Sequence, residues 1–253
     1  MGLPKIKHPT FKVKIPSTDQ KVTLRPFTVR EEKILLMAQT SNETDDLITA
    51  IKQVLTNCIL TPESEFSVDI SKLAPFDIEY LFLKLRAKSV GEIIEVVFSE
   101  KSESGEKSEG DDNDDGIVKY TAEINLDEVE IVFPEGHTKQ IKFTEDIGIT
   151  MRYPTFDQIT QMEKEEENVD GIFKMFLNSI ETVYDENGVY LPSDDFTPAE
   201  LEEFILSLST DATEKITNFF ETMPSLEHVV IAKDKDGNEK EYTIKGLADF
   251  FIL

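Results

Sequence analysis

The chain has 253 residues, 39% of them hydrophobic, which is enough to bury a core in one large domain or in two to three smaller ones. A net charge of −25 argues against nucleic acid and anionic membranes as partners, and the single cysteine, Cys58, excludes an internal disulfide and an all-cysteine zinc site. No apolar run reaches the roughly 18 residues of a membrane span, and the first residues lack a hydrophobic signal region, so we expect the protein in a cytoplasm.

The negative charge is concentrated in the later part of the chain. Residues 1–98 carry 13 Lys and Arg against 13 Asp and Glu, whereas residues 99–253 carry 13 against 38. The first 34 residues are locally basic, with 8 basic and 3 acidic side chains. This basic arm could contact phosphate, but we favour either solvated strand faces or docking to an acidic partner surface.

The first block, residues 1–90, is predicted to begin with a β-hairpin. Apolar residues alternate with lysines from Phe11 to Ile15, which indicates a strand with one buried face. A turn at Pro16 leads to a pairing strand that contains Val22 and Leu24.

Three helices are predicted to complete this block. Thr28 and Glu31 have the spacing of a capping box, which opens a helix that runs to Gln39. The next helix has one apolar stripe from Leu47 to Ile59, and Cys58 lies on it, so we interpret this thiol as buried and structural. A third helix begins at Pro75; it is apolar on two faces, so we expect it to lie between neighbouring elements.

The second block, residues 91–154, is predicted to be rich in strands. Alternating or β-branched and aromatic residues indicate strands at Ile93–Phe98, Ile117–Ile124, Val129–Phe133, Gln140–Phe143 and Ile147–Tyr153. Residues 99–116 have no aliphatic or aromatic side chain and carry 8 acidic against 2 basic groups. We interpret this tract as a long acidic hairpin loop between the first two strands.

The third block, residues 155–253, is predicted to be mainly helical and to end in a β-hairpin. Capping residues open helices at Thr155, at Thr197 and at Asp211, and an apolar stripe that runs from Val169 to Tyr184 indicates another helix before the turn at residues 185–188. Residues 228–232 and 240–245 form the hairpin strands, and Pro224 stops the preceding helix. The predicted fold class is therefore α+β, with three closely packed blocks.

Motifs that carry chemistry are incomplete in this sequence. Asp111, Asn113, Asp115 and Gly116 match the start of an EF-hand loop, but the twelfth position is Ala122 instead of Glu. A similar group at Asp234–Asn238 has glycine at the wrong offset and indicates a hairpin turn. The three histidines have no metal-ligand spacing, so we predict no catalytic residue, no metal and no cofactor.

The candidate partner-contact residues lie in two regions. Arg25 and Phe27 either lock the corner between a strand and a helix or, with Arg30, contact a partner. An aromatic cluster near the C-terminus is either core or an anchor that inserts into a neighbouring subunit. The candidates are Arg25, Phe27, Arg30, Phe219, Phe220, Met223, Phe250 and Phe251.

Eight segments, in order and spread from residue 7 to residue 251, resemble one family of viral tail proteins. They are KHPTFKVKIPST, LRPFTVREEKILLMAQ, AIKQVLTNC, FDIEYLFLKLRAKSVGE, ITMRYPT, TPAELEEFILSL, NFFETMPSL and GLADFF. Together they resemble the baseplate hub protein family of T4-type contractile-tailed bacteriophages. In some relatives the strand-rich middle carries cysteine pairs of a kind that could hold zinc; this chain has no cysteine after Cys58, so we predict no zinc.

The resemblance implies a non-enzymatic component of the central hub of the tail baseplate, with other hub proteins as partners and no small-molecule substrate. It would reside in the virion tail, and in the host cytoplasm during assembly. One alternative is a hub-assembly chaperone that is absent from the mature virion. An alternative of another class is a tail enzyme, either a cell-wall-degrading or a metal-dependent hydrolase.

Overall fold

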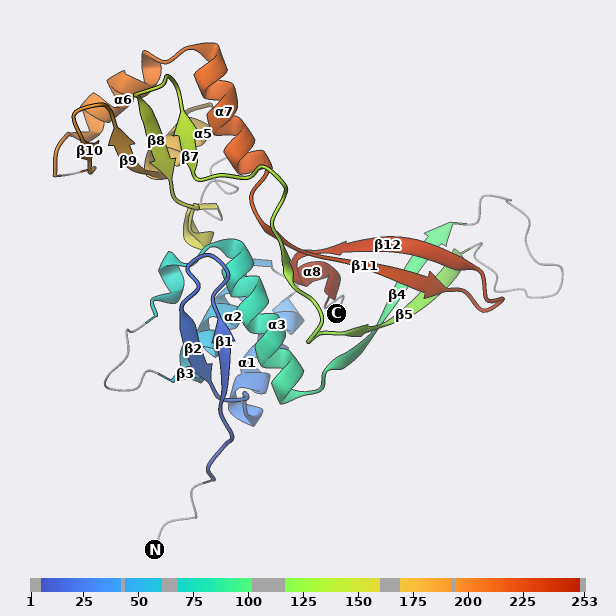
Figure 1. Cartoon of the computed structure of the whole chain (residues 1–253). Helices are drawn as coiled ribbons and strands as arrows, with labels where there is room; N and C mark the ends of the chain where they lie inside the picture. Colours follow the sequence, from blue (N-terminus) through green and yellow to red (C-terminus); the bar gives the residue numbers. More distant parts are fainter. Residues whose placement is uncertain are drawn as a thin grey trace, which may run out of the picture. The chain divides into compact units, whose positions relative to one another are not determined.

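The computed structural model of the chain describes residues 6–41, 44–60, 68–101, 117–159, 169–192 and 194–250 (Figure 1). Within these ranges, helices alternate with twelve strands that form three sheets, which confirms the α+β class. The chain divides into two compact units. Unit 1 contains Met1–Val68, Glu79–Ile131 and Ser225–Leu253, and unit 2 contains Asp69–Ile78 and Val132–Pro224. The division into three sequence blocks stays a prediction about how the chain is organised.

Unit 1 begins with the predicted hairpin. Strand β1 (Phe11–Lys14) pairs antiparallel with β2 (Lys21–Leu24), and β3 (Ile59–Leu60) adds to the other edge of β2. Asp19 closes the turn at φ 61°, a left-handed conformation that aspartate tolerates better than most residues. The alternation of apolar residues with lysines therefore produced the expected two-faced strand.

The helices of unit 1 are α1 (Val29–Ser41), α2 (Thr44–Cys58) and, from Glu79 onward, α3 (Pro75–Ser89). Pro75 occupies the first helical position of α3, as predicted. Leu81 and Leu85 lie on one side of the helix and Leu83 on the other, and all three are fully buried, which confirms that α3 lies between neighbours. Cys58 is buried, and its burial raises the pKa of the thiol to about 11, so the interpretation as a structural cysteine is confirmed.

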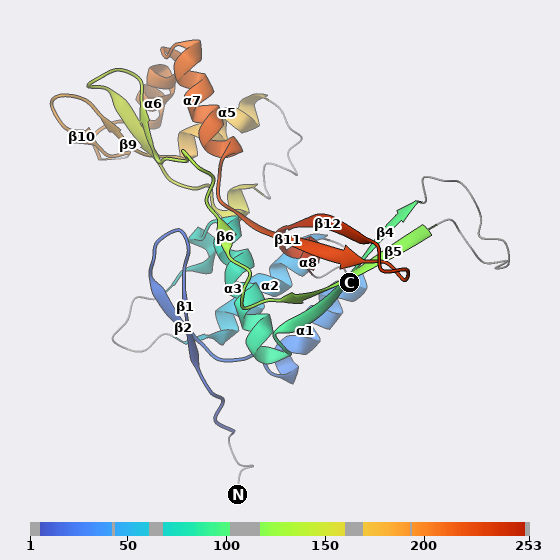
Figure 2. The ribbon, with the colours of Figure 1, turned by 45° about the vertical axis from the view of Figure 1, so that its right-hand side comes forward.

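The second sheet of unit 1 joins two hairpins. Strands β4 (Ile93–Lys101) and β5 (Ile117–Asn125) pair antiparallel over their whole length, from Ile93↔Asn125 to Lys101↔Ile117. Strands β11 (Ser225–Lys233) and β12 (Glu239–Lys245) form the second hairpin, and the sheet order is β12-β11-β5-β4 (Figure 2). Strand β6 (Ile131–Val132) also pairs with β11. Residues 102–116 of the acidic tract lie outside the described residues.

One face of this sheet is buried in the core of unit 1. Its inward side chains include Val96, Ile124, Val230 and Ile244, which pack with α3 and with Phe250 of helix α8 (Gly246–Phe250). The edge strands also touch on this face, because Phe98 of β4 stacks on Tyr242 of β12 with 4.0 Å between ring centroids. An ion pair between Lys240 and Glu100 continues the contact. The sheet is therefore folded so that its two hairpins face one another.

Lys84 attaches α3 to the chain that leaves β5. Its side chain is buried, and Nζ donates hydrogen bonds to the carbonyl oxygens of Leu126, Asp127 and Val129 at 3.1, 2.8 and 2.8 Å. Burial lowers the pKa of the Lys84 amine, and Glu130 at 3.5 Å opposes that shift. Three carbonyl groups that have left the sheet thereby keep hydrogen-bond partners.

Unit 2 contains a four-stranded antiparallel sheet with the order β10-β9-β8-β7. The strands are β7 (Gln140–Lys142), β8 (Gly148–Met151), β9 (Ile180–Tyr184) and β10 (Val189–Tyr190). The helices are α5 (Val169–Asn178), α6 (Pro198–Leu206) and α7 (Thr210–Glu221), with a short 3-10 helix at Ile70–Lys72. Apolar side chains of β7, β8, α6 and α7 form its core.

Two capping predictions in this unit are confirmed. The Thr155 amide donates to Gln158 Oε1 at 2.7 Å, and the Gln158 amide donates back to Thr155 Oγ1 at 3.3 Å. Thr197 and Glu200 form the same reciprocal arrangement at the start of α6. The polar continuation of the Thr155 helix, residues 160–168, lies outside the described residues.

Two other predictions in this unit were wrong. The apolar stripe from Val169 was expected to remain helical to Tyr184, but α5 ends at Asn178 and residues 180–184 form β9. Ile180, Thr182 and Val183 are β-branched, and pairing of β9 with both β8 and β10 outweighs the helical spacing. The helix expected to open at Asp211 begins at Thr210, because the Ser209 hydroxyl accepts from the Ala212 amide and is the actual cap.

Gly148 is required by the packing of β8. A Cβ atom at this position would fall on the Tyr184 hydroxyl and on the carbonyl oxygen of Ile141, and the latter is fixed in the neighbouring strand. We therefore expect Gly148→Ala to destabilise the protein by about 1–3 kcal/mol, as overpacking does. Urea unfolding measures this difference.

Gly188→Ala is the matched control, because a Cβ atom there meets nothing within 4 Å. Equal unfolding midpoints for the two variants would contradict this account of Gly148.

Candidate interaction surface

The segment from Arg25 to Thr28 forms the corner between β2 and α1. Its first amide, that of Arg25, donates to the carbonyl oxygen of Cys58 at 3.0 Å, which ties the corner to the end of α2. The amide of Phe27 donates to Ser89 Oγ at 3.0 Å, and this hydroxyl donates to the Leu85 carbonyl at 2.6 Å. The corner therefore joins three elements of unit 1, namely β2, α2 and α3.

A buried ion pair lies inside this corner. Arg25 Nη2 donates to Glu31 Oε1 at 2.9 Å and Nη1 donates to Oε2 at 3.4 Å, in the two-pronged geometry of an arginine–carboxylate pair. The Glu31 side chain is only 2% exposed. The amide and the hydroxyl of Thr28 also donate to Glu31, at 2.8 and 2.6 Å, which confirms that Thr28 and Glu31 open α1.

The charge on Glu31 is stabilised in spite of its burial. Burial alone would raise the pKa of this carboxyl, but the hydrogen bonds from Arg25 and from Thr28 outweigh it and lower the pKa to about 2. Glu31 is therefore ionised across the whole physiological range. Its orientation decides which side of α1 faces inward.

The outward side of α1 is apolar. Val29, Leu36 and Met37 are 79%, 55% and 63% exposed, and at spacings of seven and eight residues they lie on the same side of the helix. Arg30 and Lys33 are exposed beside them, and neither forms an ion pair with a described residue, whereas Glu32 borders the opposite edge. We call Val29, Arg30, Lys33, Leu36 and Met37 the α1 face.

The sequence-based candidates are distributed as follows. Arg25 and Phe27 belong to the corner and are partly buried, whereas Arg30 is exposed on the α1 face. Phe219 and Phe250 are buried in the cores of unit 2 and unit 1, as the core interpretation expects. Phe220 and Met223 are half-buried, and Phe251 lies outside the described residues.

Phe219 belongs to an aromatic stack within unit 2. Its ring packs on His137 at 5.2 Å and on Tyr153 at 5.6 Å between centroids. His137 hydrogen-bonds through Nδ1 with Thr222 Oγ1 and through Nε2 with the Tyr153 hydroxyl, both at 3.0 Å. Burial, with a smaller contribution from Lys139, lowers the pKa of His137, so this histidine is neutral at pH 7.

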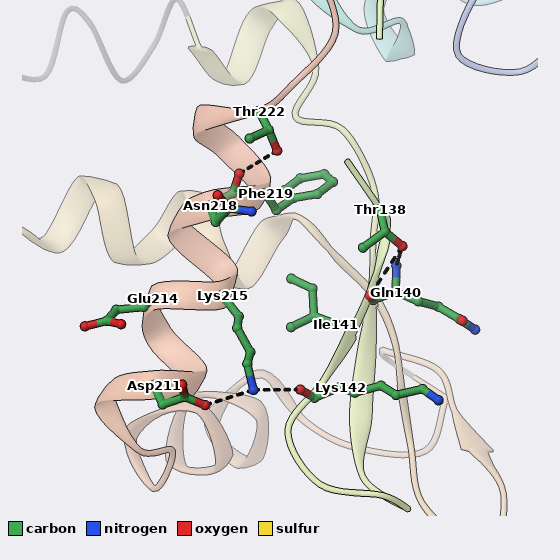
Figure 3. Close-up of a pocket in the computed structure, with 10 residues that line it drawn as sticks. All are labelled: Thr138, Gln140, Ile141, Lys142, Asp211, Glu214, Lys215, Asn218, Phe219 and Thr222. Atoms are coloured by element: carbon green, nitrogen blue, oxygen red, sulfur yellow. Dashed lines mark hydrogen bonds and ion pairs between the residues drawn. The ribbon is translucent and has the colours of Figure 1, made fainter. Parts of the chain in front are cut away.

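A pocket of about 710 Å³ lies between α7 and β7, with Ile141 and Phe219 at its floor (Figure 3). Lys215 crosses it, pairing with Asp211 at 2.8 Å and donating to the carbonyl oxygen of Lys142 at 3.3 Å. Thr138 Oγ1 accepts from the Gln140 amide at 3.1 Å. These side chains cap the outward backbone groups of edge strand β7 and so protect it from pairing with another chain.

Metal-binding patterns are not assembled in the described part of the chain, where no three His, Cys, Asp or Glu side chains gather around one point. The EF-hand-like residues Asp111–Gly116 lie outside the described ranges. Asp234 accepts from the amides of Asp236 and Asn238 at 2.9 and 2.8 Å, which confirms the hairpin turn. No helix that could cross a membrane occurs among the residues described.

Comparison with known proteins gives one match that covers nearly the whole chain. A family model described as T4 bacteriophage base plate protein matches residues 8–252. No curated protein and no solved structure gives a significant match.

The Arg25–Glu31 pair generates a prediction for stability against pH. Because the pKa of Glu31 falls from 4.5 to about 2 in the folded state, its ionised form stabilises the protein above pH 4.5. This stabilisation is lost as the pH falls toward 2. We expect Glu31→Gln to lower the free energy of unfolding at pH 7 by about 3 kcal/mol, and the deficit to shrink below pH 4.5.

Glu32→Gln is the control for this experiment, since Glu32 is the exposed neighbour on the same helical turn. Urea unfolding at several pH values compares both variants with the parent. If Glu31→Gln lowered the free energy of unfolding at pH 7 no more than Glu32→Gln does, the Arg25–Glu31 ion pair would not stabilise the fold as proposed.

Proposed function

Because this chain belongs to the T4 bacteriophage base plate protein family, we propose that it is a non-enzymatic component of the central hub of a contractile-tailed phage baseplate. Its proposed partners are other baseplate hub proteins, and its proposed locations are the virion tail and, during assembly, the host cytoplasm. The proposal excludes nucleic acid, membranes and small-molecule substrates as partners. The single observation that carries it, beyond the family, is the α1 face.

The α1 face has the composition of a protein-binding surface. Val29, Leu36 and Met37 are exposed to solvent on α1. The Arg25–Glu31 pair fixes the orientation of this helix, so the three side chains remain exposed in the folded unit 1. Apolar side chains with flanking arginine and lysine are typical of binding sites where a small number of residues supply most of the affinity. A rigid helix also loses little conformational entropy when it binds.

Charge extends the proposed mechanism to the rest of the chain. Arg30 and Lys33 suit an acidic neighbour, whereas the strongly acidic residues 99–253 suit basic ones. We also propose Phe220 and Met223 as partner contacts, because both are only half-buried near the end of α7 and leave apolar surface exposed. Complementary charge of this kind raises association rates and selects among neighbours in a crowded assembly.

A second candidate function is that of an assembly chaperone that leaves before the virion matures. The net charge of −25 favours it, because a strongly charged chain remains soluble and unassociated without its partners. Quantitative mass spectrometry of purified virions separates the two candidates. We expect a whole-number copy count of this chain relative to a tail protein of known stoichiometry, whereas absence from virions would establish the chaperone.

The alternative of another class is a tail hydrolase, and an acid-to-amide scan of residues 155–253 tests it. Loss of cell-wall lysis in one variant that keeps its fold would overturn the non-enzymatic proposal.

The α1 face itself is tested by Leu36→Asp. A carboxylate in the centre of an apolar contact is desolvated without a partner, so we expect at least a tenfold loss of incorporation into baseplates with no change in thermal unfolding. Leu206→Asp is the matched control, because Leu206 is an exposed helical leucine (69%) in unit 2. Equal incorporation of both variants would contradict a role for the α1 face.

A further inference from the structure

The outer edge of β7 is a sheet edge without a partner strand among the described residues. The four-stranded sheet of unit 2 ends at β7. In an antiparallel ladder, the main-chain groups of alternate residues point away from the neighbouring strand. The main chains of Lys139 and Phe143 hydrogen-bond toward β8, so the residues whose amides and carbonyl groups point outward are Gln140 and Lys142.

Two exposed side chains cap part of this edge. Thr138 Oγ1 accepts from the Gln140 amide at 3.1 Å, and Lys215 Nζ donates to the carbonyl oxygen of Lys142 at 3.3 Å. The Lys142 amide has no hydrogen-bond partner among the described residues. Lys215 is also paired with Asp211, but their side chains are 45% and 74% exposed. An exposed ion pair contributes little stability, so a competing strand can displace Lys215 at small cost.

A polar stripe of α7 faces the same edge across the pocket of about 710 Å³ (Figure 3). Its members recur at helical spacing and line the pocket; they are Asp211, Glu214, Lys215, Asn218 and Thr222. From first to last they span about 16 Å along the helix, which is roughly the length of a five-residue strand. The pocket therefore has the length of one extended segment that lies beside β7 and under α7.

The charge of this region favours a cationic segment. Residues 132–224 carry 20 acidic and 6 basic side chains. On the polar stripe, Asp211 pairs with Lys215, whereas Glu214 forms no ion pair with a described residue. Displacement of Lys215 would leave two carboxylates on one wall of the pocket. Because alternate side chains of a strand point to the same face, lysine or arginine at every second position of an added strand would meet that wall.

We propose that the edge of β7 accepts an extended, basic segment of another baseplate protein, which adds to the unit 2 sheet as a further strand. The main chain of the segment bonds the outward amides and carbonyl groups of Gln140 and Lys142. Its basic side chains take the place of Lys215 beside Asp211. In strand addition of this kind, main-chain bonds give affinity and side chains give selectivity. The inference rests on the proposed function, because its partner is a baseplate protein, but it assigns a surface other than the α1 face.

The side-chain caps make this edge selective. An uncapped edge strand can pair with any extended chain and promotes aggregation. A neutral or acidic strand that displaced Lys215 would leave Asp211 without a cation, whereas a basic strand supplies the replacement. Lys215 is therefore an intramolecular competitor, which protects the edge until a cationic strand arrives.

Fluorescence anisotropy with a labelled heptapeptide, in which lysine alternates with threonine, tests the site on the intact chain. At about 0.15 M salt, charges farther apart than about 8 Å are screened, and we expect saturable one-to-one binding. Two further probes of the same charge carry N-methyl groups, one on its lysine amides and the other on its threonine amides. Successive amides of a strand point to opposite edges, so we expect one methylated probe to bind about tenfold more weakly and the other to keep its affinity.

Variants of the chain test the two halves of the proposed contact. Lys215→Ala removes the competitor, and we expect it to tighten binding of the unmethylated probe about threefold. Lys174→Ala is the matched control, because Lys174 is an exposed lysine of α5 in the same unit and the change in net charge is identical. Lys142→Pro removes an outward amide, which an edge strand tolerates, and we expect it to weaken binding about fivefold. Thermal unfolding establishes that the variants are folded.

Three outcomes overturn the proposal: no saturable binding of the unmethylated probe, equal affinities of the two methylated probes, and equal effects of Lys215→Ala and Lys174→Ala. Equal affinities of the methylated probes would mean that the acidic surface attracts cations without pairing to a strand. In each case, loss of baseplate incorporation by Leu36→Asp would still support the proposed function. If the peptide results were as expected and Leu36→Asp had no effect, the α1 face would lose its role and the β7 edge would keep its own.

Discussion

The ion pair between Arg25 and Glu31 is the constraint on which the N-terminal half of unit 1 depends. Removing two charges from water is costly, and a buried pair repays that cost only when its geometry is good and its remaining lone pairs are used. Here the arginine bonds both carboxylate oxygens, and Thr28 contributes two more hydrogen bonds. Since Glu31 must face inward, Val29, Leu36 and Met37 must face outward.

Lys84 solves a related problem farther along the chain. Where β5 ends, the backbone turns away from the sheet, and its carbonyl groups lose their ladder partners. The buried ammonium group replaces those partners with three hydrogen bonds and thereby binds α3 to the sheet. The buried charges of Glu31 and Lys84 thus both act on the backbone at a place where regular structure begins or ends.

Local patterns predicted most elements, and long-range pairing accounts for the misses. Capping residues located the starts of α1 and α6, and alternation located β4 and β5, because these signals are contained within a few residues. The strand β9 was mistaken for helix, since its apolar residues also fit a helical stripe and only pairing with β8 and β10 decides between the two.

Of the α1 face, the sequence predicted Arg30 as a contact residue but missed Leu36 and Met37. Four consecutive apolar residues, Ile34 to Met37, do not show which side of the helix is buried, and a glutamate was not expected to be the inward residue.

The order of segments in unit 1 has a consequence for biosynthesis. Its sheet takes β4 and β5 from the middle of the chain and β11 and β12 from the end, with all of Val132–Pro224 in between. On a ribosome, which releases the chain from the N-terminus onward, unit 2 can complete its sheet while β4 and β5 still lack their neighbour β11. The nascent protein therefore carries an unpaired β5 edge until β11 emerges, and a product truncated before β11 would retain this aggregation-prone edge.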